Sequence, residues 1–184
     1  MSAGPRYVDG RYVAERRGNP LVQTPKGARI LSAAMLPWFA LAPPKRCGVL
    51  TTIGRRTGKA RPRCVRTIRR GDRVFVVAIG GEHNRWLMNI RANPSVRLRI
   101  RGGTYEGVAR EPRDPDERAE AKAAYCGEVN PFDYLENWAH RRGRPTRRKI
   151  VELHHAWFEG GVPLVIELGE RHSRGARLRA GGPR

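Results

Sequence analysis

Short apolar stretches bounded by glycine-containing turns dominate the middle of the sequence. Val49–Ile53 and Cys64–Ile68 flank one such turn and Val74–Ile79 follows the next, which predicts a three-stranded antiparallel meander. In residues 95–100 apolar side chains alternate with arginines, so a strand there would bury one face and expose the other. Residues 104–110 follow two glycines and predict a fifth strand.

Helical patterns accompany these strands. Residues 85–94 predict a short helix that ends near its proline. Asp114–Tyr125 carries acids in its first turn, as the helix dipole favours, and Asn130–His140 predicts another helix. Thr146 would cap a further helix, whose apolar face consists of Ile150, Leu153, His154, Trp157 and Phe158. Pro163–Leu168 predicts the last strand.

Together these elements predict an α+β fold, mainly β, with about six antiparallel strands and flanking helices. A small barrel is favoured, because closure removes exposed strand edges. At 184 residues the chain is long enough for one domain with a full core. We expect a flexible arm at 1–20, an amphipathic helix and linker at 21–46, the barrel at 47–169 and a basic disordered tail at 170–184.

An apolar segment at residues 30–43 precedes the strands. It is too short to span a bilayer, and Pro37 interrupts it. Cations flank it and it carries Trp38 and Phe39, a composition typical of a helix in a membrane interface. One prediction is therefore that Ile30 to Phe39 contacts an anionic membrane surface. Packing of the helix against its own domain explains the pattern equally well.

The formal net charge of +20 is extreme and unevenly distributed. Residues 1–71 contain sixteen lysines and arginines but two acids. Such a surface attracts nucleic acid, an acidic membrane leaflet or a polyanionic small molecule. Cys47, Cys64 and Cys126 lack the spacing of disulfide scaffolds or zinc sites, and no secretory signal is visible. We expect a cytoplasmic protein, peripherally attached to the inner face of the cell membrane.

The segment Gly54–Lys59 is a strongly basic turn at the end of an apolar strand. Its glycines allow positive φ and would let backbone N–H groups converge on one point. Four cations would surround that point: Arg55, Arg56, Lys59 and Arg61. The spacing matches neither a P-loop nor a dinucleotide-binding loop. An anion cradle and a solvated basic hairpin both explain the pattern.

A second candidate is the loop Gly80–Asn84 with the helix that follows it. Glycines at the end of a buried strand allow a flat ligand to approach closely. Trp86 offers a stacking face, and Asn89 lies three residues further on, near the same side of the helix. Alternatively, Trp86 simply anchors the helix. The adjacent His154-His155 diverge on a helix and cannot chelate one ion, so no metal site is predicted.

Taken together, the segment from Gly48 to Glu111 resembles the deazaflavin-dependent nitroreductase family, the F420-dependent oxidoreductases of split β-barrel fold (FMN-binding split barrel-like). Two motifs carry the resemblance: T-T-x-G-R-[RK]-[ST]-G-x-x-R from Thr51 to Arg61, and W-x-x-N-[IL]-x-A-N-P from Trp86 to Pro94. Relatives reduce quinones or nitroaromatics, and some associate with membranes through an N-terminal helix. The resemblance implies hydride transfer from reduced F420 to a hydrophobic conjugated acceptor.

The resemblance also implies two parts of a cofactor site. The phosphate and acidic tail of F420 would be bound by Gly54, Arg55, Arg56, Thr57, Gly58 and Arg61. The deazaflavin ring would be lined by Ala78, Ile79, Gly80, Gly81, Trp86 and Asn89. A polyanionic tail needs arginines and a planar ring needs an apolar slot, so both assignments agree with the residue types. The proton donor to the acceptor would be Tyr134 or, second, His83.

Two alternatives follow from the same features. FMN is the alternative cofactor, because related split barrels use it. A non-catalytic basic module that binds nucleic acid or anionic lipid is the alternative function. The basic patches lack the interleaved aromatic residues of a strand-binding surface, so nucleic acid is not the expected partner. The sequence departs from its relatives at Cys64, often a proline, and at Arg66, near an expected aromatic residue, and we expect substrate preference to depend on these positions.

Overall fold

Seven antiparallel strands form the main sheet of the computed structural model, which describes residues 6–8, 11–13, 25–79, 81–141 and 143–171. Across the sheet the strands follow the order β4 (Ala60–Arg66), β3 (Cys47–Ile53), β7 (Ser95–Ile100), β8 (Gly103–Arg110), β9 (Val162–Arg171), β6 (Arg73–Ala78) and β5 (Ile68–Arg70). Every neighbouring pair is antiparallel. The sheet therefore contains one strand more than the sequence predicts.

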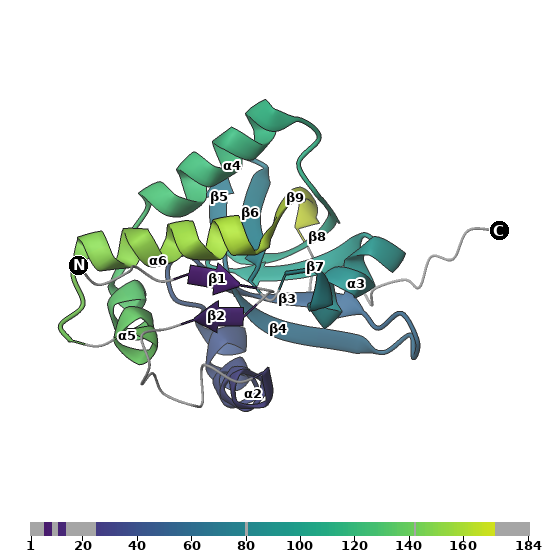
Figure 1. Cartoon of the computed structure of the whole chain (residues 1–184). Coiled ribbons are helices and arrows are strands. Elements are labelled where there is room, and N and C mark those ends of the chain that lie inside the picture. The colour runs from purple at the N-terminus through teal and green to yellow at the C-terminus, as the bar shows by residue number, and fades with distance from the viewer. Residues whose placement is uncertain (1–5, 9–10, 14–24, 80, 142, 172–184) are drawn as a thin grey trace.

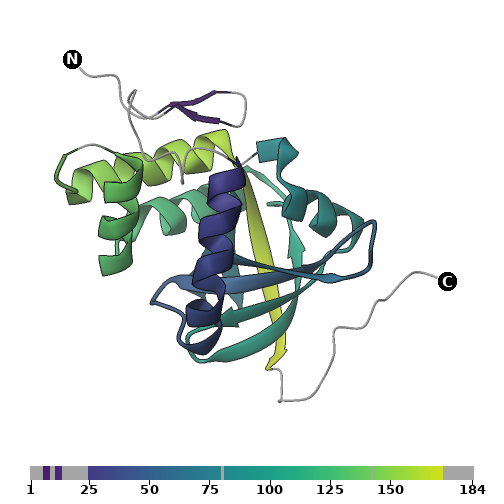
Figure 2. The same cartoon turned by 90° about the horizontal axis from the view of Figure 1, so that it is seen from below.

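The two edge strands of this sheet, β4 and β5, are consecutive in the chain and separated by Thr67 alone. Edges joined by one residue must lie close together in space, so the sheet has to roll up. Figure 1 and Figure 2 show the strands curling around a common interior. The fold is the split β-barrel that the resemblance implies, with helices packed around it.

The predicted three-stranded meander is wrong. β4 pairs with β3, but β6 pairs with β5 on one side and with β9 on the other. The predicted strand Cys64–Ile68 is divided at Thr67: its N–H donates to the Arg46 carbonyl (2.8 Å) at the end of the β3–β4 ladder, and Ile68 already pairs with Phe75 of β6. This break sends the chain from one edge of the sheet to the other.

Apolar side chains from five strands of the sheet and from helix α3 (Arg85–Ala92) fill the barrel interior. α3 follows a short 3-10 turn, η1 (Gly81–His83), and ends before Pro94 as predicted. The interior cluster consists of Leu50, Val74, Val76, Ala78, Trp86, Leu87, Ile90, Val96, Leu98, Ile100, Ala109, Leu164 and Ile166.

Three helices cover one outer face of the barrel: α4 (Pro115–Gly127), α5 (Pro131–His140) and α6 (Arg147–Gly160). Their N-caps are Asp114, Asn130 and Thr146, each accepting a hydrogen bond from the first turn. All five residues of the predicted apolar face of α6 are buried. The helical part of the prediction is confirmed.

Helix α2 (Pro25–Leu41) lies across β3 and β4 and continues through Pro37 rather than being interrupted there (Figure 2). Its Phe39 is buried against Cys47 and Val49, so this residue of the predicted membrane-contacting segment packs on the domain. Trp38 is 51% exposed, and Ile30, Leu31 and Leu41 of the same helix are also exposed. In the described part of the chain no helix is long and apolar enough to cross a membrane.

At the N-terminus, β1 (Arg6–Val8) and β2 (Arg11–Val13) pair antiparallel, and β1 lies against α6. Most of the predicted flexible arm lies outside the described residues, as do residues 172–184 of the predicted tail. The domain boundaries stay predictions.

Candidate functional site

The basic turn between β3 and β4 is held by its own backbone. The Gly54 N–H donates to the Lys59 carbonyl (2.9 Å), and the Thr57 and Gly58 N–H groups both donate to the Gly54 carbonyl (3.1 and 2.8 Å). Gly58 has a φ of 62°, a conformation that glycine adopts without steric cost. These N–H groups are consumed inside the turn. Convergence of backbone N–H groups on a ligand stays a prediction, and the exposed basic side chains are the other donors that the turn offers to an anion.

Gly54 has no room for a side chain. A Cβ at this position would lie 2.9 Å from the Thr57 hydroxyl and 3.2 Å from the Lys59 carbonyl. Both atoms belong to the same turn, so a larger residue at this position would force the backbone of the turn to move.

Four exposed cations extend from this hairpin: Arg55, Arg56, Lys59 and Arg61. None of them forms an ion pair within the described ranges, whereas many other arginines of the protein do, such as Arg110 with Glu117 and Glu167. Among the described residues, the one side-chain hydrogen bond of the four is from Arg61 Nη2 to the Thr57 hydroxyl (3.4 Å). No described carboxylate therefore cancels their charge, and the hairpin presents a strong positive field to a ligand.

Asn89 of α3 joins the hairpin to the rest of the site. Its Oδ1 accepts the Arg55 N–H (3.2 Å), and its Nδ2 donates to the Thr52 hydroxyl (3.1 Å). Asn89 is 7% exposed and Thr52 is fully buried. Both ends of the Asn89 amide are therefore used by the protein, and this residue sets the position of the hairpin against α3. Sequence reasoning singled out Asn89 but missed Thr52.

The predicted ring-lining residues lie where β6 ends and α3 begins, on the same side of the barrel as the hairpin (Figure 1). Ala78 is buried in the barrel interior, Ile79 is half-buried, and Gly81 is buried with a φ of 58°. Gly80 lies outside the described residues. Trp86 is 8% exposed and belongs to the barrel core. Its position supports the anchoring interpretation and leaves little of the ring surface open to a ligand.

The two candidate proton donors are far apart. His83 is exposed in η1, directly before α3. Tyr134 is 39% exposed on α5, and α3 and α5 lie on opposite sides of the molecule in both views (Figure 1, Figure 2). The structure therefore brings His83, but not Tyr134, to the end of the barrel that carries the hairpin.

Arg66, where the sequence departs from its relatives, is not open to a substrate. Its guanidinium is 4% exposed, pairs with Asp133 and donates to the Glu128 carbonyl (2.5 Å). It also lies over the ring of Tyr125, 5.3 Å from the centroid. These contacts tie β4 to α5. Burial of Arg66 was not visible in the sequence, because its partner is 67 residues away.

The buried groups around this pair have strongly shifted pKa values. Burial and the nearby Arg66 charge lower the pKa of His154 to about 3, so the imidazole is neutral at pH 7. Glu136 is half-buried, and its partial removal from water raises the pKa of its carboxyl to about 7, although Arg66 opposes the shift. His154 on α6 and Glu136 on α5 belong to the helical side of the molecule, and α5 and α3 lie on opposite sides in both views (Figure 1, Figure 2).

Comparison with known proteins defines the class to which this fold and site belong. Residues 41–142, more than half of the chain, match the profile of the F420H(2)-dependent quinone reductase family. The chain belongs to this family and is an F420-dependent oxidoreductase, which favours F420 over FMN and an enzyme over a non-catalytic basic module.

Solved structures with low sequence identity also align with the chain. One is described as an F420-H2 dependent reductase, with 19% identity, a TM-score of 0.43, and coverage of 67% of this chain and 94% of that chain. Another is a conserved hypothetical protein from Mycobacterium tuberculosis, with 17% identity, a TM-score of 0.47, and coverage of 82% and 92%. The family match, rather than these likenesses, identifies the chain.

The residues of the hairpin fit an F420 tail. Phosphate and carboxylate groups require charged donors, and the hairpin supplies three arginines and a lysine that no carboxylate of the described chain neutralises. Gly58, in the same turn, has open space beside it and carries no side chain that could block an approaching anion. The donor set is therefore suited to a polyanion.

Proposed function

We propose that the protein reduces a hydrophobic, conjugated acceptor of the quinone type, with nitroaromatics as the second class. The family, whose description names quinone reduction, supports the acceptor class, and the basic hairpin fixed to α3 by Asn89 supports binding of the anionic cofactor. When bound, F420H2 supplies the hydride. A quinone that gains this hydride and one proton becomes a hydroquinone.

The residues of the chain bind and orient. Arg55, Arg56 and Arg61 would hold the anionic tail, and the residues at the end of β6 and the start of α3 would take the ring. Ala78 and Gly81 are both buried at the end of the barrel where the ring would lie, so this part of the proposed ring site is apolar. The imidazole of His83 is exposed on that side of the barrel and is the first proton donor to test, with the phenol of Tyr134 second.

Titration with F420, followed by visible absorbance, tests the binding part. The variant Arg56→Ala/Arg61→Ala should bind F420 roughly a hundredfold more weakly, since each lost charge-assisted bond is worth about 1.5 kcal/mol or more. The matched control Arg144→Ala/Arg147→Ala removes the same charge from exposed positions near the start of α6 and should bind normally. Equal loss in both variants would mean that net charge, and not the hairpin, binds the cofactor.

Single-turnover oxidation of bound F420H2 tests the acceptor. Menadione and a nitroaromatic compound are compared at equal concentration, and we expect faster oxidation by menadione. His83→Gln should slow the reaction and change its pH profile, while leaving F420 affinity unchanged. Failure of every quinone to oxidise the bound cofactor would refute the proposed acceptor class.

We also propose that α2 attaches the enzyme to a membrane surface. Ile30, Trp38 and Leu41 are 55%, 51% and 80% exposed, although all three have large apolar side chains that proteins usually bury. On the neighbouring α5, Leu135 and Trp138 are 58% and 66% exposed. Trp38→Ser/Leu41→Ser should reduce co-sedimentation with vesicles. Unchanged co-sedimentation would argue for a surface covered by protein.

A further inference from the structure

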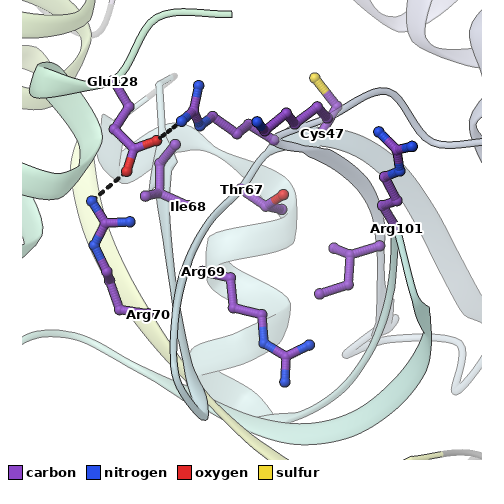
Figure 3. Close-up of a pocket in the computed structure, with 10 residues that line it drawn as sticks. Cys47, Thr67, Ile68, Arg69, Arg70, Arg101 and Glu128 are labelled. Carbon is purple, nitrogen blue, oxygen red and sulfur yellow. Dashed lines mark ion pairs between the residues drawn. The ribbon is translucent and has the colours of Figure 1, made fainter.

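A second basic site lies at the end of the barrel opposite to the hairpin. β3 starts at Cys47 and ends at Ile53, directly before the basic turn, so at about 3.3 Å per residue the two ends are roughly 20 Å apart. Around Cys47 a cavity of about 280 Å³ opens at the end of the barrel (Figure 3). We call it the basic mouth; it is lined by Lys45, Arg46, Cys47, Thr67, Ile68, Arg69, Arg70, Ile100, Arg101 and Glu128.

The mouth contains five cations and one carboxylate. That carboxylate, Glu128, is shared by Arg46 and Arg70, as the dashed lines of Figure 3 show. The remaining cations, Lys45, Arg69 and Arg101, have no carboxylate partner in the part of the chain that the structure describes. The cavity therefore has an excess of positive charge, which an anionic ligand would neutralise.

Arg69 is held in place by neutral partners. Its Nε donates to the Gly71 carbonyl (2.8 Å), its Nη1 donates to the Tyr105 hydroxyl (3.1 Å), and its Cζ lies 4.9 Å from the centre of the Tyr105 ring. Neutral partners fix the guanidinium without cancelling its charge. Figure 3 shows the Arg69 side chain extending into the opening between the strands. A preorganised guanidinium loses little side-chain entropy when it binds an anion.

The rim of the mouth is also fixed. Arg46 has a φ of 64°, which no other non-glycine residue of the described segments shares. This left-handed conformation is unfavourable for an L-residue. A turn from the Cys47 N–H to the Pro44 carbonyl (3.0 Å), the bond from the Thr67 N–H to the Arg46 carbonyl (2.8 Å) and a bond from Arg46 Nη1 to the Val129 carbonyl (3.0 Å) hold it there. The charged rim is therefore rigid.

We propose that the basic mouth binds the phosphate group of a small phosphate ester. Guanidinium groups pair with phosphate through parallel hydrogen bonds, and several cations together favour a multiply charged group over a single carboxylate. The cavity is at the small end of the range for ligand sites, so it accommodates a phosphoryl group with a small substituent. A nucleic-acid duplex is too broad to enter it.

The phosphate has two possible sources, a free metabolite and a lipid headgroup. Arg99 Nη2 donates to the Leu41 carbonyl (3.4 Å), which places the exposed end of α2 beside β7, whose last residue Ile100 lines the mouth. An enzyme resting on a membrane through Leu41 would hold the mouth near the headgroups. The chemistry of recognition is the same for both sources.

Calorimetric titration with pyrophosphate tests the site, and the Arg56→Ala/Arg61→Ala chain is used throughout so that the hairpin does not contribute. Adding Arg69→Gln/Arg101→Gln, both exposed, should weaken pyrophosphate binding at least tenfold. Adding the matched control Arg144→Gln/Arg147→Gln should leave it unchanged. Equal weakening by both pairs, or no binding of pyrophosphate at millimolar concentration, would overturn the proposal.

Vesicles distinguish the two sources. If phosphatidylglycerol vesicles bind, lose affinity on Arg69→Gln/Arg101→Gln and compete with pyrophosphate, the phosphate comes from a lipid. If vesicle binding does not change while pyrophosphate binding falls, the ligand is a free phosphate ester. Binding of duplex DNA that is reduced equally by both charge-removal pairs, with no pyrophosphate site, would overturn the proposal in favour of diffuse electrostatics.

A measurement on the native chain makes the test independent of variant folding. Phenylglyoxal modifies accessible arginines, and mass spectrometry locates the modified positions. Pyrophosphate should protect Arg69 and Arg101 and should not protect Arg144. Equal modification with and without pyrophosphate would overturn the proposal even if every variant unfolded.

Discussion

Replacing Asn89 with alanine tests the link between α3 and the basic hairpin. The amide accepts the Arg55 N–H (3.2 Å) and donates to the buried Thr52 hydroxyl (3.1 Å). Each of these bonds contributes about 1 kcal/mol, and a buried hydroxyl left without its donor costs a further 1 kcal/mol or more, in a range of about 1–3. We expect the free energy of unfolding to fall by about 3 kcal/mol. Because the hairpin loses its support, F420 affinity should also fall.

Urea unfolding of four chains measures the effect: the native chain, Asn89→Ala, Thr52→Val and the double variant. The two single changes remove opposite ends of one hydrogen bond, so their effects should be coupled by about 1 kcal/mol. Met88→Ala, an exposed change on the same helix, is the control and should cost less than about 0.5 kcal/mol. If the effects of Asn89→Ala and Thr52→Val simply add, the bond does not stabilise the site and the reasoning is refuted.

Three further changes test other parts of the structure. Gly54→Ala should lower stability by about 1–2 kcal/mol and weaken F420 binding, because the new Cβ would lie 2.9 Å from another atom of the turn. In the control Gly127→Ala the new Cβ meets nothing within 4 Å, so the thermal midpoint should stay unchanged or rise. Equal midpoints for the two variants would contradict the steric argument. Asp133→Asn leaves the buried Arg66 without its counter-charge and should cost about 3–5 kcal/mol in urea unfolding, and a loss below about 1 kcal/mol would show that the pair is not important for stability. Burial raises the pKa of Glu136 from 4.5 to about 7, so the folded state binds this proton more tightly and stability falls as pH rises from about 4.5 through 7. Glu136→Gln should therefore be about 2 kcal/mol more stable than the native chain at pH 8 and equally stable near pH 4, while a difference that does not change with pH would contradict the assignment.

Local chemistry explains the part of the fold that the sequence predicts well. Asp114, Asn130 and Thr146 were expected near or at helix starts, and all three are N-caps, because capping depends on atoms within one turn. Strand alternation likewise placed the apolar residues of β7 inside the barrel.

Pairing over long sequence distances explains the part that was missed. A meander joins each strand to the next, but β6 pairs with β9, so that Ala78 lies opposite Val162. No local pattern around either residue specifies that partner. Nor did the sequence indicate the break at Thr67 between β4 and β5, since residues 64–68 read as one continuous strand.

In the candidate site, too, local features could be predicted from the sequence and long-range contacts could not. The cations of the hairpin follow from the residues of one turn, and their exposure could be expected from the sequence. The Asn89–Thr52 bond spans 37 residues and the Arg66–Asp133 pair spans 67, so neither could be assigned before the fold was known. Trp86 was ambiguous, because an aromatic residue at the start of a helix suits both a ligand and a core.

The position of β9 in the sheet has a consequence for how the protein folds during synthesis. β9 is the last of the described strands to be made, yet it lies between β8 and β6 and pairs with both. Until residues 162–171 leave the ribosome, the sheet consists of two separate parts, and the free sides of β8 and β6 are unpaired edges that other chains can join. We therefore expect the barrel to close late and slowly, since its closing contacts join distant parts of the chain, and we expect nascent chains to depend on chaperones at this stage.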